Sequence, residues 1–329
     1  MPSKRIGLIF VLCAAGICGQ FTRGDSQLPD EAKSAFASGD YSRAIKILNR
    51  AASENPRDAA LQHLLARCYF ESEQYDRAIP PAEASISLEP KNSTYHELLG
   101  RAYGEKADRS GWMSGLSLAK KARKEFETAV QLDERNFSAM QALIEYDCSA
   151  PAIANGGEDK ARPEIEQLRS LDAAEGHYAA GNCRRQKKDF AAADAEFRKA
   201  LALHPTSADL IYDIGDHYMK HNQAEGLQLA IAEGQRSAPA DPRLNFYRAV
   251  ESTLQKQNLS EAEQLFRDYL AKAPRRNNYP SKAMSHYWLG RVQENCNDEA
   301  SAKKEYQEAL NLEPKNRFAN EALKRLRRD

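Results

Sequence analysis

Residues 174–205 constrain the fold of this chain more than any other stretch, because they have the pattern of a complete helical hairpin. Gly181 stands where the first helix would cross the second, and Ala193 lies on the facing stripe of the second helix. Phe197 supplies a bulky side chain at this crossing. Pro205 ends the second helix, because proline lacks a backbone N–H and clashes with the preceding turn. The stretch predicts two short helices joined by a seam of small residues.

The same hairpin pattern recurs along the chain. The closing prolines Pro56 and Pro90 are 34 residues apart, as are Pro205 and Pro239. An alanine four residues before a mostly large, apolar residue marks each unit, at Ala44, Ala78, Ala122, Ala161, Ala193, Ala262 and Ala302. A fixed period of about 20–50 residues is typical of a solenoid, in which each unit needs only its neighbours to bury its apolar face. The sequence therefore predicts an all-α fold.

The spacing resembles the tetratricopeptide repeat, whose first helix pairs a large with a small residue and places a tyrosine three positions later. The pairs that carry the resemblance are Leu65-Ala66 with Tyr69, Leu99-Gly100 with Tyr103, Ile214-Gly215 with Tyr218, and Leu289-Gly290. The resemblance implies a right-handed α-solenoid of about eight helix-turn-helix units over residues 28–316. It also implies a protein that binds other proteins. Residues 317–329 have the apolar face of a capping helix.

The N-terminal segment has the pattern of an export signal. Residues 1–20 combine Lys4 and Arg5 with the apolar run 6–18 and a small, polar processing zone, and we expect cleavage within 15–24. The apolar run has 13 residues, too few to span a bilayer, so we expect no transmembrane segment. An exported protein of the periplasm or cell envelope follows, with secretion or a lipid anchor as alternatives.

The charge balance of the chain bears on the class of partner it can bind. The chain has 47 basic and 47 acidic residues, so its charge gives no reason to expect nucleic acid as a partner.

Outside residues 1–20, Cys68 and Cys183 lie three units apart, too far for a disulfide. Cys148 and Cys183 lie on adjacent units; we favour buried thiols there, with a disulfide as the alternative.

Two adjacent units carry insertions, within residues 104–121 and 150–159. Both insertions fall between the first and second helix, so we expect them to form loops that lie side by side. Their large apolar residues are Trp112, Met113, Leu116 and Ile153. Either the four side chains form a contact patch for a partner, or, as we favour, Trp112 and Leu116 fold back to fill the widened gap. The segments GWMSGLSLAKKARKEF and APAIANGGEDKAR also resemble a subgroup of bacterial exported tetratricopeptide proteins.

A second candidate surface is the inner curve of the solenoid, which first-helix positions line in repeats of this kind. The residues expected there are Tyr178, Asn182, Tyr212, Asp216, Phe246, Tyr287 and Arg291. Successive rings with polar groups beside them suit an extended peptide or a partner helix. The alternative is that the rings serve only for packing.

Two smaller groups of residues are further candidate binding sites. Arg67 and Arg101 occupy equivalent positions in adjacent units and could jointly hold a carboxylate; the alternative, which we favour, is that Arg67 pairs with a nearby glutamate. Asp213, His217 and His221 are spaced four residues apart on one helix, a geometry that suits a metal or small ligand. Seven scattered histidines, however, produce such spacing readily.

The sequence contains no Gly-rich phosphate loop, nucleophile elbow or zinc-protease motif. Tandem helical hairpins also present an open curved surface, whereas catalysis usually needs an enclosed pocket. We therefore expect a non-enzymatic protein without a cofactor. It would act as an interaction scaffold or assembly factor of the bacterial cell envelope and bind a protein or peptide. The alternative is a metal- or small-ligand-binding solenoid.

Overall fold

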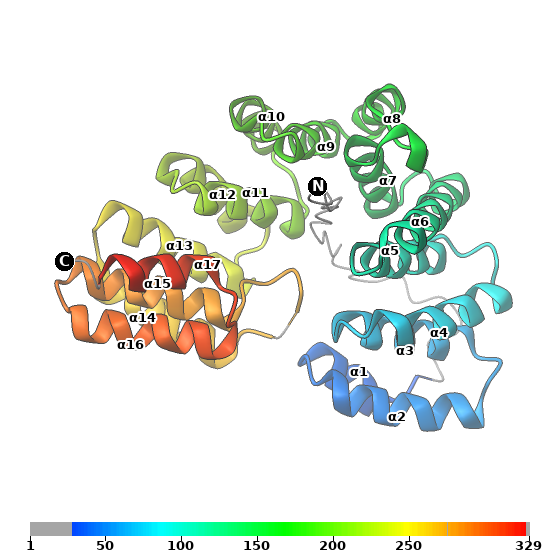
Figure 1. The fold of residues 1–329 in the computed structure, drawn as a ribbon, viewed down its shortest axis with the longest axis horizontal. Coiled ribbons are helices and arrows are strands. Elements are labelled where there is room, and N and C mark those ends of the chain that lie inside the picture. Colours follow the sequence, from blue (N-terminus) through cyan, green and yellow to red (C-terminus); the bar gives the residue numbers. More distant parts are fainter. Residues whose placement is uncertain (1–27, 275, 327–329) are drawn as a thin grey trace. The chain divides into compact units, whose positions relative to one another are not determined.

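The computed structural model describes residues 28–274 and 276–326. Over these residues the chain forms 17 α-helices and no strand, so the predicted all-α helical repeat fold is confirmed (Figure 1). The predicted signal segment, residues 1–20, lies outside the described residues. Contacts divide the chain into two compact units, with the boundary between Leu203 and His204.

The helices of both units are short and follow one another closely. In the first unit they are α1 (Asp30–Ala37), α2 (Tyr41–Glu54), α3 (Ala59–Glu71), α4 (Tyr75–Leu88), α5 (Ser93–Asp108), α6 (Trp112–Leu132), α7 (Phe137–Ser149), the 3-10 helix η2 (Ala152–Ala154), α8 (Glu158–Leu171), α9 (Ala173–Gln186) and α10 (Phe190–Ala202). In the second unit they are α11 (Ala208–Lys220), α12 (Ala224–Ser237), α13 (Pro242–Gln255), α14 (Leu259–Lys272), α15 (Lys282–Asn295), α16 (Glu299–Leu312) and α17 (Arg317–Arg325).

Each unit is a stack of helical hairpins. Within each unit, every helix packs against the helices before and after it in the chain. The first helix of a hairpin also contacts the first helix of the next, as α3 does with α5 and α11 with α13. First helices therefore form one layer of the stack and second helices the other, the arrangement expected of a helical repeat (Figure 1).

The seam of small residues holds each hairpin together as the sequence predicts. Ala193 is fully buried, and Phe197 fills the crossing beside Gly181. A Cβ atom added at Gly181 would lie 2.5 Å from the ring of Phe197, so only glycine permits this approach. The marker alanines of the other units are buried as well.

Short polar side chains set where many of the helices begin. The carboxylate of Asp189 accepts a hydrogen bond from the backbone N–H of Ala192, and Ser281 caps Met284 in the same way. Such caps satisfy N–H groups that have no partner inside the helix. They define the hairpin turns and therefore the register of the repeats.

The first insertion is helical, so the expectation of a loop there was wrong. Its residues lengthen α5 and α6, and only residues 109–111 separate the two helices. Leu116 and Ala119 lie on one side of α6 and pack against Ala107 of α5. Helical spacing of these apolar residues lets the extra turns bury one face, which favours helix over loop.

Candidate partner-binding site

The two insertions lie side by side in the first unit. Ala107 and Ala119 from the first insertion share a small apolar cluster with Ala150 and Ala154 from the second. The hydroxyl of Tyr146 donates a hydrogen bond of 2.5 Å to the backbone carbonyl of Ala154, which holds η2 against this cluster. The structure therefore supports one continuous surface built from both insertions.

Among the large apolar side chains of the insertions, one fills the gap between the units and the others are exposed, as a contact patch requires. Leu116 is partly buried against the cluster and helps to fill the gap. Trp112, Met113 and Ile153 are 56%, 83% and 61% exposed, more than any other large apolar side chain in the described chain. We call these three residues the insertion patch. Exposed apolar side chains that gather in one place mark interaction sites, whereas single ones are common on any surface.

A shallow, open hollow lies beside the insertion patch, between α6 and η2. It is lined by Lys120, Arg123, Lys124, Glu127, Ala152, Ile153 and Asn155. Ile153 of the patch lines this hollow, and α6, which begins with Trp112 and Met113, forms its other side.

The charged side chains around the hollow differ in how far a neighbouring opposite charge compensates them. The guanidinium of Arg123 donates to both carboxylate oxygens of buried Asp147, at 2.9 and 2.8 Å, and lies 3.3 Å from Glu127. Burial and the negative charge of Asp147 raise the pKa of the Glu164 carboxyl to about 8, so Glu164 is largely uncharged at neutral pH. Lys120, one turn along α6, is exposed.

The aromatic residues of the predicted inner curve are mostly core residues. Tyr178, Tyr212 and Phe246 are only 1%, 2% and 0% exposed. Tyr212 stacks on Tyr247 with ring centroids 5.3 Å apart, and the Tyr247 hydroxyl donates to Asp216 at 2.7 Å. These rings therefore pack between repeats, which is the alternative that the sequence left open.

The other predicted inner-curve residues are buried or make contacts within the chain. Asn182 is buried. Tyr287 is partly buried and lies 5.5 Å from the ring of Phe318 on α17, measured between centroids. Arg291 donates to the side-chain oxygen of Asn222 at 2.6 Å. A partner would have to displace these contacts to use this surface.

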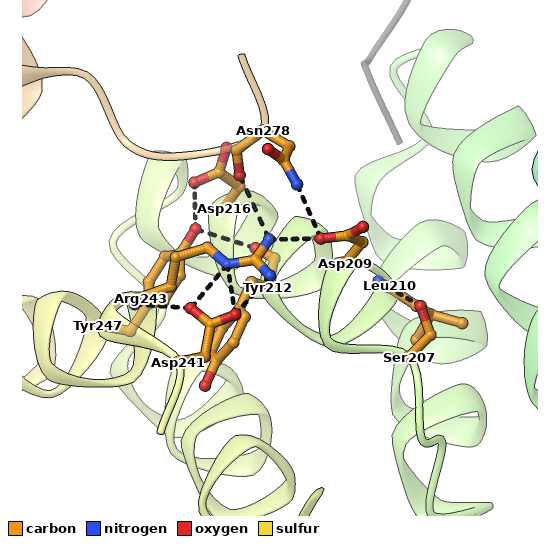
Figure 2. A network of polar contacts seen from close by, with 9 residues as sticks. All are labelled: Ser207, Asp209, Leu210, Tyr212, Asp216, Asp241, Arg243, Tyr247 and Asn278. Atoms are coloured by element: carbon orange, nitrogen blue, oxygen red, sulfur yellow. Dashed lines mark hydrogen bonds and ion pairs between the residues drawn. The ribbon is translucent and has the colours of Figure 1, made fainter. Parts of the chain in front are cut away.

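Figure 2 shows a buried ion network in the second unit, centred on Arg243 of α13. Arg243 donates to Asp209 of α11 at 2.7 Å and to Asp241 at 2.7 Å. The side-chain amide of Asn278, in the loop before α15, donates to the same Asp209 oxygen at 2.8 Å. Burial alone would lower the pKa of Arg243, but the hydrogen bond to Asp241 and the charge of Asp209 raise it. The network ties three segments together and keeps Arg243 charged.

The two arginines proposed for a carboxylate make contacts inside the first unit. Arg101 donates to Glu97 at 2.9 Å and to the hydroxyl of Ser138 at 2.7 Å. The guanidinium of Arg67 lies 4.8 Å from the centre of the Phe36 ring. Pairing with a nearby glutamate is therefore seen for Arg101, and a cation–π contact for Arg67.

The proposed metal ligands do not converge. His217 is buried while His221 is exposed, with ring centroids 4.8 Å apart. Among the described residues, no group of three histidine, cysteine, aspartate or glutamate side chains is placed to hold a metal ion.

The structure assigns a disulfide between Cys148 of α7 and Cys183 of α9, with Cα atoms 5.4 Å apart. The expectation of buried thiols was wrong for this pair, because adjacent first helices bring the two positions within bonding reach. Cys68 is a buried free thiol and Cys296 an exposed one.

Repeated histidine–glutamate pairs are a feature that the sequence reasoning missed. They are His96–Glu125, His177–Glu196 and His286–Glu305, each with 2.7 Å between Nδ1 and Oε2. Each histidine lies four residues before the seam glycine of its hairpin, and each glutamate three residues after the marker alanine. This shared spacing could have revealed the histidine–glutamate pairs from the sequence.

The hairpins also match known repeats in sequence. A tetratricopeptide repeat model matches residues 35–102, and a second tetratricopeptide repeat model matches residues 174–207 and 284–316. The chain contains tetratricopeptide repeats.

Solved tetratricopeptide repeat proteins are among the structures similar to this chain. One from Thermus thermophilus is 16% identical, with 69% of this chain and 98% of that chain covered and a TM-score of 0.45. One from Parabacteroides merdae is 14% identical, with 83% and 100% covered and a TM-score of 0.45. The C-terminal part of a repeat-containing protein from Cytophaga hutchinsonii is 19% identical, with 89% and 98% covered and a TM-score of 0.41. No curated protein matches the sequence.

Tetratricopeptide repeats indicate a scaffold for protein–protein interaction, and their fold is generally non-catalytic. No helix in the described part of the chain combines the length and apolar character needed to cross a bilayer.

Proposed function

We propose that this tetratricopeptide repeat protein is a non-catalytic scaffold or assembly factor of the bacterial cell envelope. It binds a peptide or protein partner through the insertion patch, formed by Trp112, Met113 and Ile153. The observation that carries the proposal is that the three most exposed large apolar side chains of the described chain all belong to the two insertions, which pack against each other.

The patch has the properties of an interaction site. Its side chains come from the two neighbouring hairpins with insertions, and the other described repeats have no equivalent. Trp112 offers a large contact area at low conformational cost, which is why tryptophan is frequent among residues that dominate binding. The buried cluster packs α6 against η2, the two elements that carry the patch, and elements held in place in this way need less ordering when a partner binds.

The inner curve is the weaker surface for a partner. Its rings at Tyr178, Tyr212 and Phe246 are buried, so they contribute to stability. Any contact there would involve the accessible parts of Asp216, Tyr287 and Arg291.

Export to the envelope is part of the proposal. It is supported by the signal pattern of residues 1–20 and by the Cys148–Cys183 disulfide, because such bonds persist mainly in oxidising compartments. Fractionation of the native host, with an antibody against the chain, tests this. Recovery in the periplasmic or envelope fraction, with the disulfide protected from thiol labelling, is expected. Recovery in the cytoplasm with both Cys148 and Cys183 reactive in the denatured chain would refute it.

Affinity capture from envelope extract tests the binding site. The wild type should retain a partner that the double variant Trp112→Ser/Met113→Ser loses, because the variant removes the apolar anchor. Leu229→Ser/Leu312→Ser is the matched control, since it removes two exposed leucines elsewhere. Equal capture by wild type and patch variant would exclude the patch as the binding site.

A further inference from the structure

We propose that the partner of the insertion patch presents a short acidic segment with an apolar side chain, and that this segment docks in the hollow between α6 and η2. The inference rests on the proposed function, because it describes what the patch binds. It concerns second-helix residues and a turn, so the site is separate from the first-helix residues predicted for the inner curve.

The hollow has an apolar side and a basic side. Ala152 and Ile153 form the apolar side, and exposed Trp112 and Met113 lie at the start of α6, the helix that forms the other side. Lys120 and Lys124 form the basic side; they lie four residues apart on α6 and therefore project from the same face. An apolar side chain of a partner can enter between the two sides while a neighbouring carboxylate meets the lysines.

The charge of the hollow favours an acidic partner. Arg123 is compensated by Asp147, and the carboxylate of Glu127 lies 3.3 Å from the same arginine. Lys120 and Lys124 are exposed, and the hydrogen bonds and ion pairs described for the chain give their ammonium groups no carboxylate. The side-chain oxygen of Asn155 accepts from Lys160 at 2.6 Å, which leaves its N–H₂ group as a further donor. Donors without acceptors make this surface complementary to carboxylates.

A peptide segment fits this surface better than the two other candidate occupants. A second copy of the chain, docked symmetrically, would bring the same lysines toward one another, and like charges oppose such contact. A flat bilayer surface has no projecting side chain to enter a hollow. A chain segment supplies both the projection and the carboxylate.

Peptide display on the full-length protein tests the inference. A random library of peptides of about 12 residues, long enough to cross the patch and the hollow, is selected on the immobilised wild type. We expect the recovered sequences to be enriched in aspartate and glutamate beside an aromatic or aliphatic residue. A library that yields no binder, or only neutral and basic ones, would overturn the inference.

Tryptophan fluorescence can report the binding of the recovered peptide directly. The chain has two tryptophans, and Trp288 is 2% exposed while Trp112 is 56% exposed. A synthetic copy of the peptide should shift the emission of Trp112 to shorter wavelength, and Trp112→Phe should remove the shift. The same shift produced by raising protein concentration alone, or by vesicles of phosphatidylglycerol, would assign the patch to self-association or to lipid and overturn the inference.

Charge reversal separates this inference from the proposed function. Lys120→Glu/Lys124→Glu should weaken peptide binding about tenfold or more at low salt, and added salt should weaken wild-type binding in the same direction. Lys91→Glu/Lys315→Glu, which reverses two exposed turn lysines elsewhere, should leave binding unchanged.

Envelope capture with the same variants distinguishes a failure of this inference from a failure of the proposed function. If the partner needs Trp112 and Met113 but binds Lys120→Glu/Lys124→Glu equally well, the proposed function stands and the acidic segment is refuted. If the partner needs neither pair, the proposed function fails as well.

Discussion

Gly181 illustrates how a single position supports the hairpin. A Cβ atom there would meet the Phe197 ring at 2.5 Å, so Gly181→Ala should force the ring to move and lower the free energy of unfolding. Overpacking costs about 1–3 kcal/mol, of which the better helix propensity of alanine returns about 1 kcal/mol. Urea unfolding of wild type and variant measures the difference. Gly111→Ala is the control, because nothing lies within 4 Å of its added Cβ; an equal loss in both variants would contradict the packing argument.

His96 gives the chain a pH-dependent contribution to stability. The hydrogen bond to Glu125 raises the pKa of His96 above its ordinary value of 6.5, although burial opposes the shift. Both ring nitrogens face acceptors, Glu125 at 2.7 Å and the carbonyl of Pro90 at 3.1 Å, so the protonated ring satisfies both. Because the folded pKa is raised, this stabilisation is complete below pH 6.5 and is lost as pH rises through the folded pKa.

Glu125→Gln should remove most of that contribution. We expect the variant to be about 0.5–1 kcal/mol less stable than wild type at pH 5.5 and nearly equal to it at pH 9. Thermal melts across this pH range measure the difference. A gap that stays constant with pH would mean that the charge of His96 is not involved.

At the scale of elements, one covalent bond joins two neighbouring first helices. The Cys148–Cys183 disulfide connects α7 and α9 across a sequence separation of 35 residues, which restricts the unfolded chain. Cys148→Ser/Cys183→Ser should therefore lower the free energy of unfolding by about 2–4 kcal/mol. Calorimetry with and without reductant tests this: reductant should lower the melting temperature of wild type and Cys296→Ser but leave the double variant unchanged. A wild type insensitive to reductant would count against the bond.

The Arg243 network joins elements in the second unit. Arg243→Met would leave the carboxylates of Asp209 and Asp241 buried without a compensating charge, and we expect a loss of about 3–5 kcal/mol. Arg248→Met on the same helix is the control, because Arg248 is exposed. Denaturant unfolding of both variants measures the effect. Similar stabilities for the two variants would show that the network contributes little.

At the scale of the whole molecule, the division at Leu203 and His204 makes a prediction about independent folding. Residues 204–329 contain the Arg243 network, and α17 covers the apolar face around Tyr306 at the end. Since stacked repeats need only their neighbours, this fragment should fold alone, with helical circular dichroism and one cooperative melt. A fragment that begins at residue 224 lacks α11 and should be less stable. An unfolded 204–329 fragment would contradict the division.

The two insertions show where prediction from sequence ended. Their position between first and second helices followed from the repeat register, and so did their adjacency. Whether Trp112 and Leu116 protrude or pack depended on where the lengthened α6 meets Ala107 and Tyr146. That contact is set by three-dimensional geometry and leaves no periodic signal in the sequence.

The sequence by itself determined the helical repeat, its seam of small residues and the placement of the insertions. These properties depend on local helix periodicity and on contacts between nearest neighbours, which recur in every unit and so can be read repeatedly. Only the tertiary structure decided which rings are buried, that Cys148 bonds Cys183, and how Arg243 is compensated. The disulfide and the Arg243–Asp209 ion pair are each a single contact between residues about one repeat apart, and a contact made once has no period to reveal it. Burial of a ring depends on how neighbouring hairpins pack, which the repeat pattern does not specify.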